Sequence, residues 1–102
     1  MRIITMFDLP TETKNDRRAA TQFRNNLLKD GYNMLQYSIY QRICPNLDQT
    51  NKYLRKLEAY KPKSGAVRAL TITNKQYEDM IFLVGQKTKK EKYANTDQFT
   101  LF

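Results

Sequence analysis

The stretch RIITMFD at residues 2–8 constrains the fold of this chain more than any other part of the sequence. It is short, almost continuously apolar and rich in β-branched residues, a pattern typical of a strand buried on both faces. In such a strand Ile3 and Phe7 point to one side of the sheet, while Ile4 and Met6 point to the other. Both faces of the sheet must therefore be covered, and the second cover has to come from elsewhere in this chain or from another chain.

The rest of the chain alternates between helix-like and strand-like patterns. Thr13 and Asp16 have the spacing of a capping box, which predicts a helix from there to Asp30 that is closed by Gly31. Apolar residues at helical spacing predict a second helix after Pro45. The predicted strands are residues 2–8, two strands within 32–44 that are joined by a turn near 36–38, and residues 66–73.

This order of elements predicts the α+β class and the ferredoxin-like (βαββαβ) fold, an antiparallel four-stranded sheet with two helices on one face. Two further segments are available for the second face: residues 80–84, read as a fifth strand after a short helical turn, and QFTLF at 98–102. We expect a face-to-face homodimer in which both segments cross to the partner. The chain is then one domain, with the core and fifth strand at 1–85 and a polar connector with a C-terminal strand tail at 86–102.

Charge and composition narrow the class of partner and of chemistry. The chain has 18 Lys and Arg against 10 Asp and Glu, a net charge of +8, which favours nucleic acid or an anionic membrane surface as partner. No stretch reaches the roughly 18 apolar residues of a membrane span, and no signal-peptide pattern opens the chain, so we expect a cytoplasmic protein outside the membrane. With no histidine and one cysteine, Cys44, the sequence excludes a disulfide framework and a zinc cluster. Hydrolytic chemistry would have to use carboxylates and a hard cation.

Asp8 is the candidate for such chemistry, because it ends the first predicted strand. In a dimer whose axis passes nearby, Asp8 would face its own copy, and two converging carboxylates could hold one Mg²⁺. That arrangement would allow a metal-dependent phosphodiesterase. The alternative is that the Asp8 carboxylate accepts hydrogen bonds from the backbone of the turn at residues 9–11.

Basic side chains on the first helix and within strands are candidate phosphate contacts. They include Lys14, Arg17 and Arg18 on the helix, and Arg2, Arg42 and Arg68 in strands. If they converge, they form a phosphate-binding track that ignores base sequence and depends strongly on salt. The alternative for the helix stripe is an ordinary solvated helix face.

Three motifs together resemble the CRISPR-associated Cas2 family: MFDLPTET, which ends the first strand, LLKDGY at the end of the first helix, and QYSIY in the following strands. The likeness extends over nearly the whole chain. It implies a ferredoxin-like homodimer whose fifth strand and tail cross to the partner. It also implies a place between two dimers of the Cas1 integrase, where the assembly binds a double-stranded DNA prespacer and inserts it at the CRISPR repeat.

For many members, the resemblance further implies a Mg²⁺-dependent endoribonuclease or DNase in which the strand-one aspartate is the catalytic metal ligand. That residue is Asp8 here. The resemblance also implies that Arg17, Arg18 and Arg42 contact phosphates, because relatives are basic in these regions. We nevertheless expect the main function to be that of a nucleic-acid scaffold in CRISPR adaptation, with an endoribonuclease as the alternative. The reason is that one carboxylate per chain provides few catalytic groups for hydrolysis. Mg²⁺ would bridge Asp8 of two protomers. The apolar tail residues Phe99, Leu101 and Phe102 are the expected contacts to the integrase.

Overall fold

The computed structural model describes residues 1–92 of the 102-residue chain. The elements are β1 (Arg2–Asp8), α1 (Lys14–Lys29), β2 (Asn33–Gln36), β3 (Ile39–Ile43), α2 (Leu47–Ala59), β4 (Ala66–Ile72) and α3 (Asn74–Glu78). The first six follow the predicted strand–helix–strand–strand–helix–strand order. The predicted tail strand, with Phe99, Leu101 and Phe102, lies outside the described residues.

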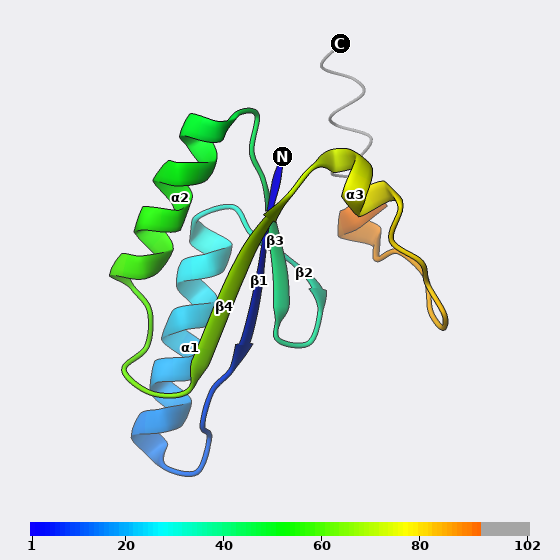
Figure 1. Cartoon of the computed structure of the whole chain (residues 1–102). Coiled ribbons are helices and arrows are strands. Elements are labelled where there is room, and N and C mark those ends of the chain that lie inside the picture. Colours follow the sequence, from blue (N-terminus) through cyan, green and yellow to red (C-terminus); the bar gives the residue numbers. More distant parts are fainter. Residues whose placement is uncertain (93–102) are drawn as a thin grey trace.

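The four strands form one sheet in the order β2-β3-β1-β4, and each neighbouring pair is antiparallel. Figure 1 shows α1 and α2 side by side on one face of this sheet. The α+β class and the antiparallel sheet are therefore confirmed, and the arrangement is compatible with a ferredoxin-like fold. Within residues 1–92, no helix has the length and apolar character needed to cross a membrane.

Local capping signals explain where the helices begin and end. The Thr13 hydroxyl accepts a hydrogen bond from the Asp16 amide at 3.0 Å, and the Asp16 carboxylate accepts one from the Thr13 amide at 3.3 Å. The Asn46 side chain caps α2 by accepting from the Gln49 amide at 2.9 Å. Gly31 follows the last turn of α1 with φ of +92°, a conformation that residues with a Cβ rarely adopt.

The joint between β2 and β3 lies where it was predicted. The two strands are separated by Tyr37 and Ser38, and Ser38 has φ of +65°. The pairing shifts register between Met34 and Gln36, which marks a bulge just before the turn. The Ser38 carbonyl accepts a hydrogen bond from the Phe7 amide at 3.0 Å, so the turn is fastened to the end of β1.

The main core fills the space between the sheet and the two helices. Ile3 of β1 is fully buried there among Phe23 and Leu27 of α1, which are 2% and 0% exposed. Phe7 packs edge-on against Phe23 at 5.1 Å between ring centroids and stacks with Tyr40 at 5.6 Å. Ile3 and Phe7 thus share the helix-covered face, as the alternation in β1 predicts.

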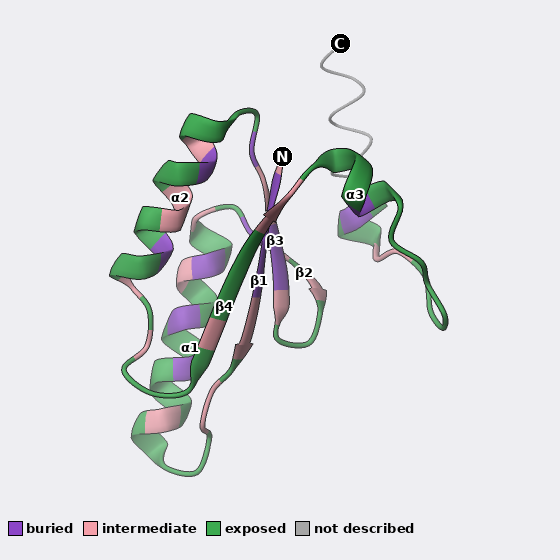
Figure 2. Ribbon diagram, viewed as in Figure 1, coloured by how far each residue is buried: buried purple, intermediate pink, exposed green. Residues whose placement is uncertain are grey.

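The second face of the sheet is covered at one end only. Figure 1 shows α3 and the segment that follows it on the side of the sheet opposite α1 and α2. Residues 2–5 of β1 are buried, Met6 is half-buried and Asp8 is exposed, while β4 is largely exposed (Figure 2). Residues 80–84, predicted as a fifth strand, form no strand in the described part of this single chain and are exposed.

Candidate nucleic-acid interface and the Asp8 site

Asp8 is the last residue of β1 and lies on the second face of the sheet. Its register partner on β4 is Ala66, and the preceding residue on the same face, Met6, pairs with Arg68. Asp8 is exposed, and its carboxylate makes no hydrogen bond or ion pair with residues 1–92. The alternative in which the turn at residues 9–11 occupies this carboxylate is therefore not realised.

The backbone around Asp8 is held tightly by the loop that enters β4. Gly65 has φ of +93°, and a Cβ added there would lie 2.7 Å from the Asp8 carbonyl oxygen and 3.0 Å from Leu9 Cδ2. A side chain here would be strained at positive φ and would also clash with Asp8 and Leu9, so only glycine fits this position. The exposed carboxylate is thus carried by a well-fixed strand end.

One chain does not complete a metal site at Asp8. Among residues 1–92, no three His, Cys, Asp or Glu side chains lie close enough together to hold a metal ion. Mg²⁺ in proteins is held by one or two carboxylates together with waters and substrate phosphates. One chain supplies one carboxylate, Asp8, to a two-carboxylate site, and the second carboxylate would have to come from another copy of the chain.

The start of α1 carries free positive charge at the same end of the molecule as Asp8 (Figure 1). Lys14, Arg17 and Arg18 are all exposed on this part of the helix. The Arg17 guanidinium donates to the carbonyls of Thr11 at 3.1 Å and Glu12 at 3.2 Å, which fastens the loop between β1 and α1. Lys14 and Arg18 have no ion pair with any described residue, so their charges face solvent uncompensated.

Arg42 lies at the opposite end of α1 and is occupied by the protein itself. Its guanidinium stacks on the ring of Tyr53 at 3.8 Å from the centroid. Its Nε donates to the Asp30 carbonyl at 3.1 Å, and its Nη1 donates to the Ile43 carbonyl. The structure therefore does not bring Arg42 together with the basic residues at the start of α1.

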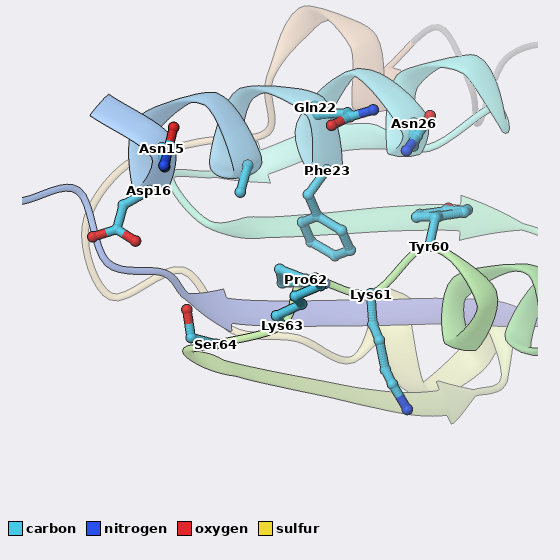
Figure 3. Close-up of a pocket in the computed structure, with 11 residues that line it drawn as sticks. Asn15, Asp16, Gln22, Phe23, Asn26, Tyr60, Lys61, Pro62, Lys63 and Ser64 are labelled. Atoms are coloured by element: carbon cyan, nitrogen blue, oxygen red, sulfur yellow. The ribbon is translucent and has the colours of Figure 1, made fainter. Parts of the chain in front are cut away.

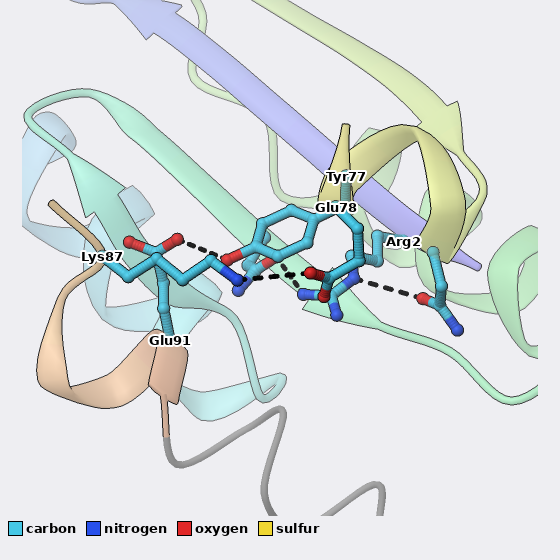
Figure 4. Close-up of polar contacts among 7 residues, drawn as sticks. Arg2, Tyr77, Glu78, Lys87 and Glu91 are labelled. Carbon is cyan, nitrogen blue, oxygen red and sulfur yellow. Dashed lines mark hydrogen bonds and ion pairs between the residues drawn. The ribbon is translucent and has the colours of Figure 1, made fainter. Parts of the chain in front are cut away.

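Arg2 shows how a charge inside a strand can be accommodated without an anion. It is 1% exposed, and its guanidinium lies 3.7 Å from the centroid of the Tyr77 ring. It donates to the side-chain oxygens of Asn74 at 3.2 Å and Gln41 at 2.9 Å (Figure 4). Burial lowers the pKa of Arg2, while the neighbouring Tyr77 and acidic groups oppose that shift. This cluster fixes α3 to the second face.

The expected polar connector contributes to the same cluster. The Tyr77 hydroxyl donates to the carboxylate of Glu91, which is 3% exposed (Figure 4). The Glu91 amide donates to the Thr88 hydroxyl at 3.1 Å, and the Thr88 amide donates to the Glu91 carboxylate at 3.0 Å. Our sequence analysis missed this packing, although Thr88 and Glu91 have the spacing of a capping box.

A hollow of about 500 Å³ lies on the helix layer, between α1 and the connection from α2 to β4 (Figure 3). Asn15, Gln22 and Asn26 line one side, and Lys61 and Lys63 line the other. Asp8 is not among the lining residues, so this hollow is no part of a site at the end of β1.

Comparison with known proteins identifies the family. The family model described as CRISPR associated protein Cas2 matches residues 1–80, which contain β1 to β4 and α1 to α3. The chain belongs to the Cas2 family. The resemblance found in the opening, helix-end and strand motifs is thus confirmed.

Three relatives that bear the name CRISPR-associated endoribonuclease Cas2 are similar along most or all of the chain. The one from Acidovorax ebreus (strain TPSY) is 47% identical over 102 residues, covering 100% of both chains. The one from Campylobacter jejuni (strain NCTC 11168) is 44% identical over 100% of this chain and 71% of its own length. The one from Ligilactobacillus salivarius (strain UCC118) is 42% identical over 90 residues, 88% of this chain and 89% of the relative. A CRISPR-related role follows for this Cas2 protein.

Proposed function

We propose that this Cas2-family chain is a homodimeric scaffold of CRISPR adaptation, which binds duplex DNA through its backbone and bridges dimers of the Cas1 integrase. The observation that carries the proposal is the positive charge of Lys14 and Arg18 on an exposed helix face, which no acidic residue within 1–92 compensates. Exposed cations without acidic partners bind phosphates at little desolvation cost and without reading base sequence. The net charge of +8 acts in the same direction by attracting polyanions at long range.

Duplex binding is tested by fluorescence anisotropy with labelled DNA over a series of salt concentrations. We expect the log of the affinity to fall linearly with the log of salt concentration, and Lys14→Gln/Arg18→Gln to make that slope shallower by about 1.8, or 0.9 for each phosphate contact. Lys14→Arg/Arg18→Lys is the matched control, since it changes the same two side chains and keeps both charges. Absence of duplex binding by the parent protein would refute the proposal.

Bridging of the integrase is tested by co-expression. We expect the integrase to co-purify with this chain, and we expect changes of Phe99, Leu101 and Phe102 to Ser to abolish that co-purification while the core stays folded. Spacer acquisition in cells should survive Asp8→Ala, because the scaffold requires no hydrolysis. Loss of acquisition with a folded Asp8→Ala protein would contradict this separation of roles.

A Mg²⁺-dependent endoribonuclease is the second candidate, and two observations favour it. The relatives carry endoribonuclease names, and the Asp8 carboxylate is exposed and makes no hydrogen bond or ion pair with any described residue. A Mg²⁺ between Asp8 of two protomers would supply activated water and neutralise phosphate charge. Asp8 would act as ligand, so the isosteric Asp8→Asn variant should lose cleavage of RNA and retain duplex binding. Cleavage that persists in Asp8→Asn or in excess chelator would rule out this candidate.

A further inference from the structure

Tyr53 on α2 gathers three cationic side chains around one aromatic ring. The Arg42 guanidinium carbon lies 3.8 Å from the ring centroid, and the amines of Lys52 and Lys56 lie at 5.5 and 5.2 Å. The ring face attracts each cation, but the lysines also repel each other, because residues four apart on a helix are neighbours.

The cluster carries more positive charge than its surroundings neutralise. Within residues 1–92, its one acidic partner is Asp30, whose Oδ1 lies 3.3 Å from the Lys56 amine. Lys52 has no hydrogen bond or ion pair there. The hydrogen bonds of Arg42 end on neutral carbonyls of Asp30 and Ile43. Three cations against one carboxylate leave a charge of 3 − 1 = +2, concentrated around one ring.

We propose that this Tyr53 cluster is a second phosphate-binding site for the nucleic-acid backbone, with Lys52 and Lys56 as the phosphate contacts. The inference rests on the proposed nucleic-acid binding and goes beyond it by assigning two new contact residues. Arg42 adds charge and holds the Tyr53 ring in place, since its Nε and Nη1 donate to backbone carbonyls.

The position of the cluster favours a polymer over a free phosphate as its ligand. Through Lys56 the Tyr53 cluster contacts Asp30, the C-cap of α1. The other basic surface, formed by Lys14 and Arg18, lies at the start of the same helix. The interval of 30 − 18 = 12 residues corresponds to about 18 Å of helix. Phosphates repeat at about 3.4 Å along one strand of a duplex, so a strand of about six nucleotides reaches both surfaces.

The test compares two double variants in the duplex-binding titration. Lys52→Gln/Lys56→Gln removes both cationic contacts, and Gln has about the same helix propensity as Lys. Lys52→Arg/Lys56→Arg is the control, because it changes the same two side chains and keeps both charges. We expect the first pair to make the salt slope shallower by about 1.8 and to weaken binding on the order of 50-fold at 0.1 M salt, as the slope of 0.9 per contact implies. The control pair should leave the slope within error of the parent, and far-UV circular dichroism should be unchanged in both.

The outcomes separate this inference from the proposed function. A parent that binds duplex with a steep salt slope, and a Lys52→Gln/Lys56→Gln variant that matches the parent or the control, would overturn the second site alone. A parent that binds no duplex would overturn both. If inorganic phosphate binds the parent but not the variant, while duplex binding is equal in the two, the cluster is a site for a free anion and the inference is wrong.

Discussion

At the scale of single residues, three arginines of this chain show that burial, rather than sequence position, decides what a charge does. Arg2 and Arg42 both lie in strands, and each places its guanidinium on a tyrosine ring, with hydrogen bonds to neutral oxygens. Arg18 is exposed and has no such partner among the residues that the structure describes. Arg2 and Arg42 therefore stabilise the fold here, and Arg18 remains available for ligands.

Buried tyrosines give the stability of the chain a defined dependence on alkaline pH. Burial raises the pKa of Tyr32 from 10.0 to about 12, and it also raises the pKa values of Tyr60 and Tyr77. Between pH 10 and 12 the unfolded chain loses the Tyr32 proton while the folded chain keeps it, so the free energy of unfolding falls as pH rises. Urea unfolding at a series of pH values should show this decline, and Tyr32→Phe should make it shallower. A stability that stays constant to pH 12 would contradict the raised pKa.

At the scale of elements, the sequence correctly predicted the helix ends and the turn between β2 and β3. The capping box at Thr13, the left-handed Gly31 and the β2–β3 turn all depend on a few neighbouring residues, and all were found where they were predicted. The packing of α3 and residues 86–92 on the second face was not predicted, because Arg2 and Tyr77 are 75 residues apart and no local pattern links them. In the same way, the sequence predicted Asp8 as a candidate, while its exposure and its lack of a partner within residues 1–92 depend on strands far along the chain.

The junction between β1 and β4 yields a prediction on backbone geometry. Gly65→Ala places a Cβ 2.7 Å from the Asp8 carbonyl at positive φ, and we expect a loss of about 2–4 kcal/mol in the free energy of unfolding. Gly85→Ala is the matched control, since Gly85 has φ of +96° but nothing within 4 Å of the added Cβ. It should cost about 1 kcal/mol from backbone strain alone. If urea unfolding shows equal losses of unfolding free energy in the two variants, the close contact with Asp8 does not contribute to stability.

At the scale of the whole molecule, the exposed apolar surface lies mainly on one side. Leu70 on β4 is 44% exposed, and its register partner Ile4 lies on the same second face. The segment at 80–84 adds five exposed apolar residues, with Ile81 at 79% and Val84 at 93%. Exposed apolar residues in such numbers are typical of an interaction site, and an unpaired strand edge readily joins another sheet. These features support the proposed homodimer, in which the second face of one chain packs on that of its partner.

Substitution of Leu70 tests the homodimer directly. Leu70→Glu places a charge on the face that the partner would cover, and an unpaired buried carboxylate costs several kcal/mol, so we expect the dissociation constant to rise by at least about 100-fold. Leu47→Glu is the matched control, because Leu47 is 57% exposed in the first turn of α2, where an acidic residue is favourable. Sedimentation velocity should find a dimer for the parent and for Leu47→Glu, and a monomer for Leu70→Glu with unchanged circular dichroism. A monomeric parent would refute the homodimer, whereas a Leu70→Glu variant that remains dimeric would place the interface elsewhere than on this face of β4.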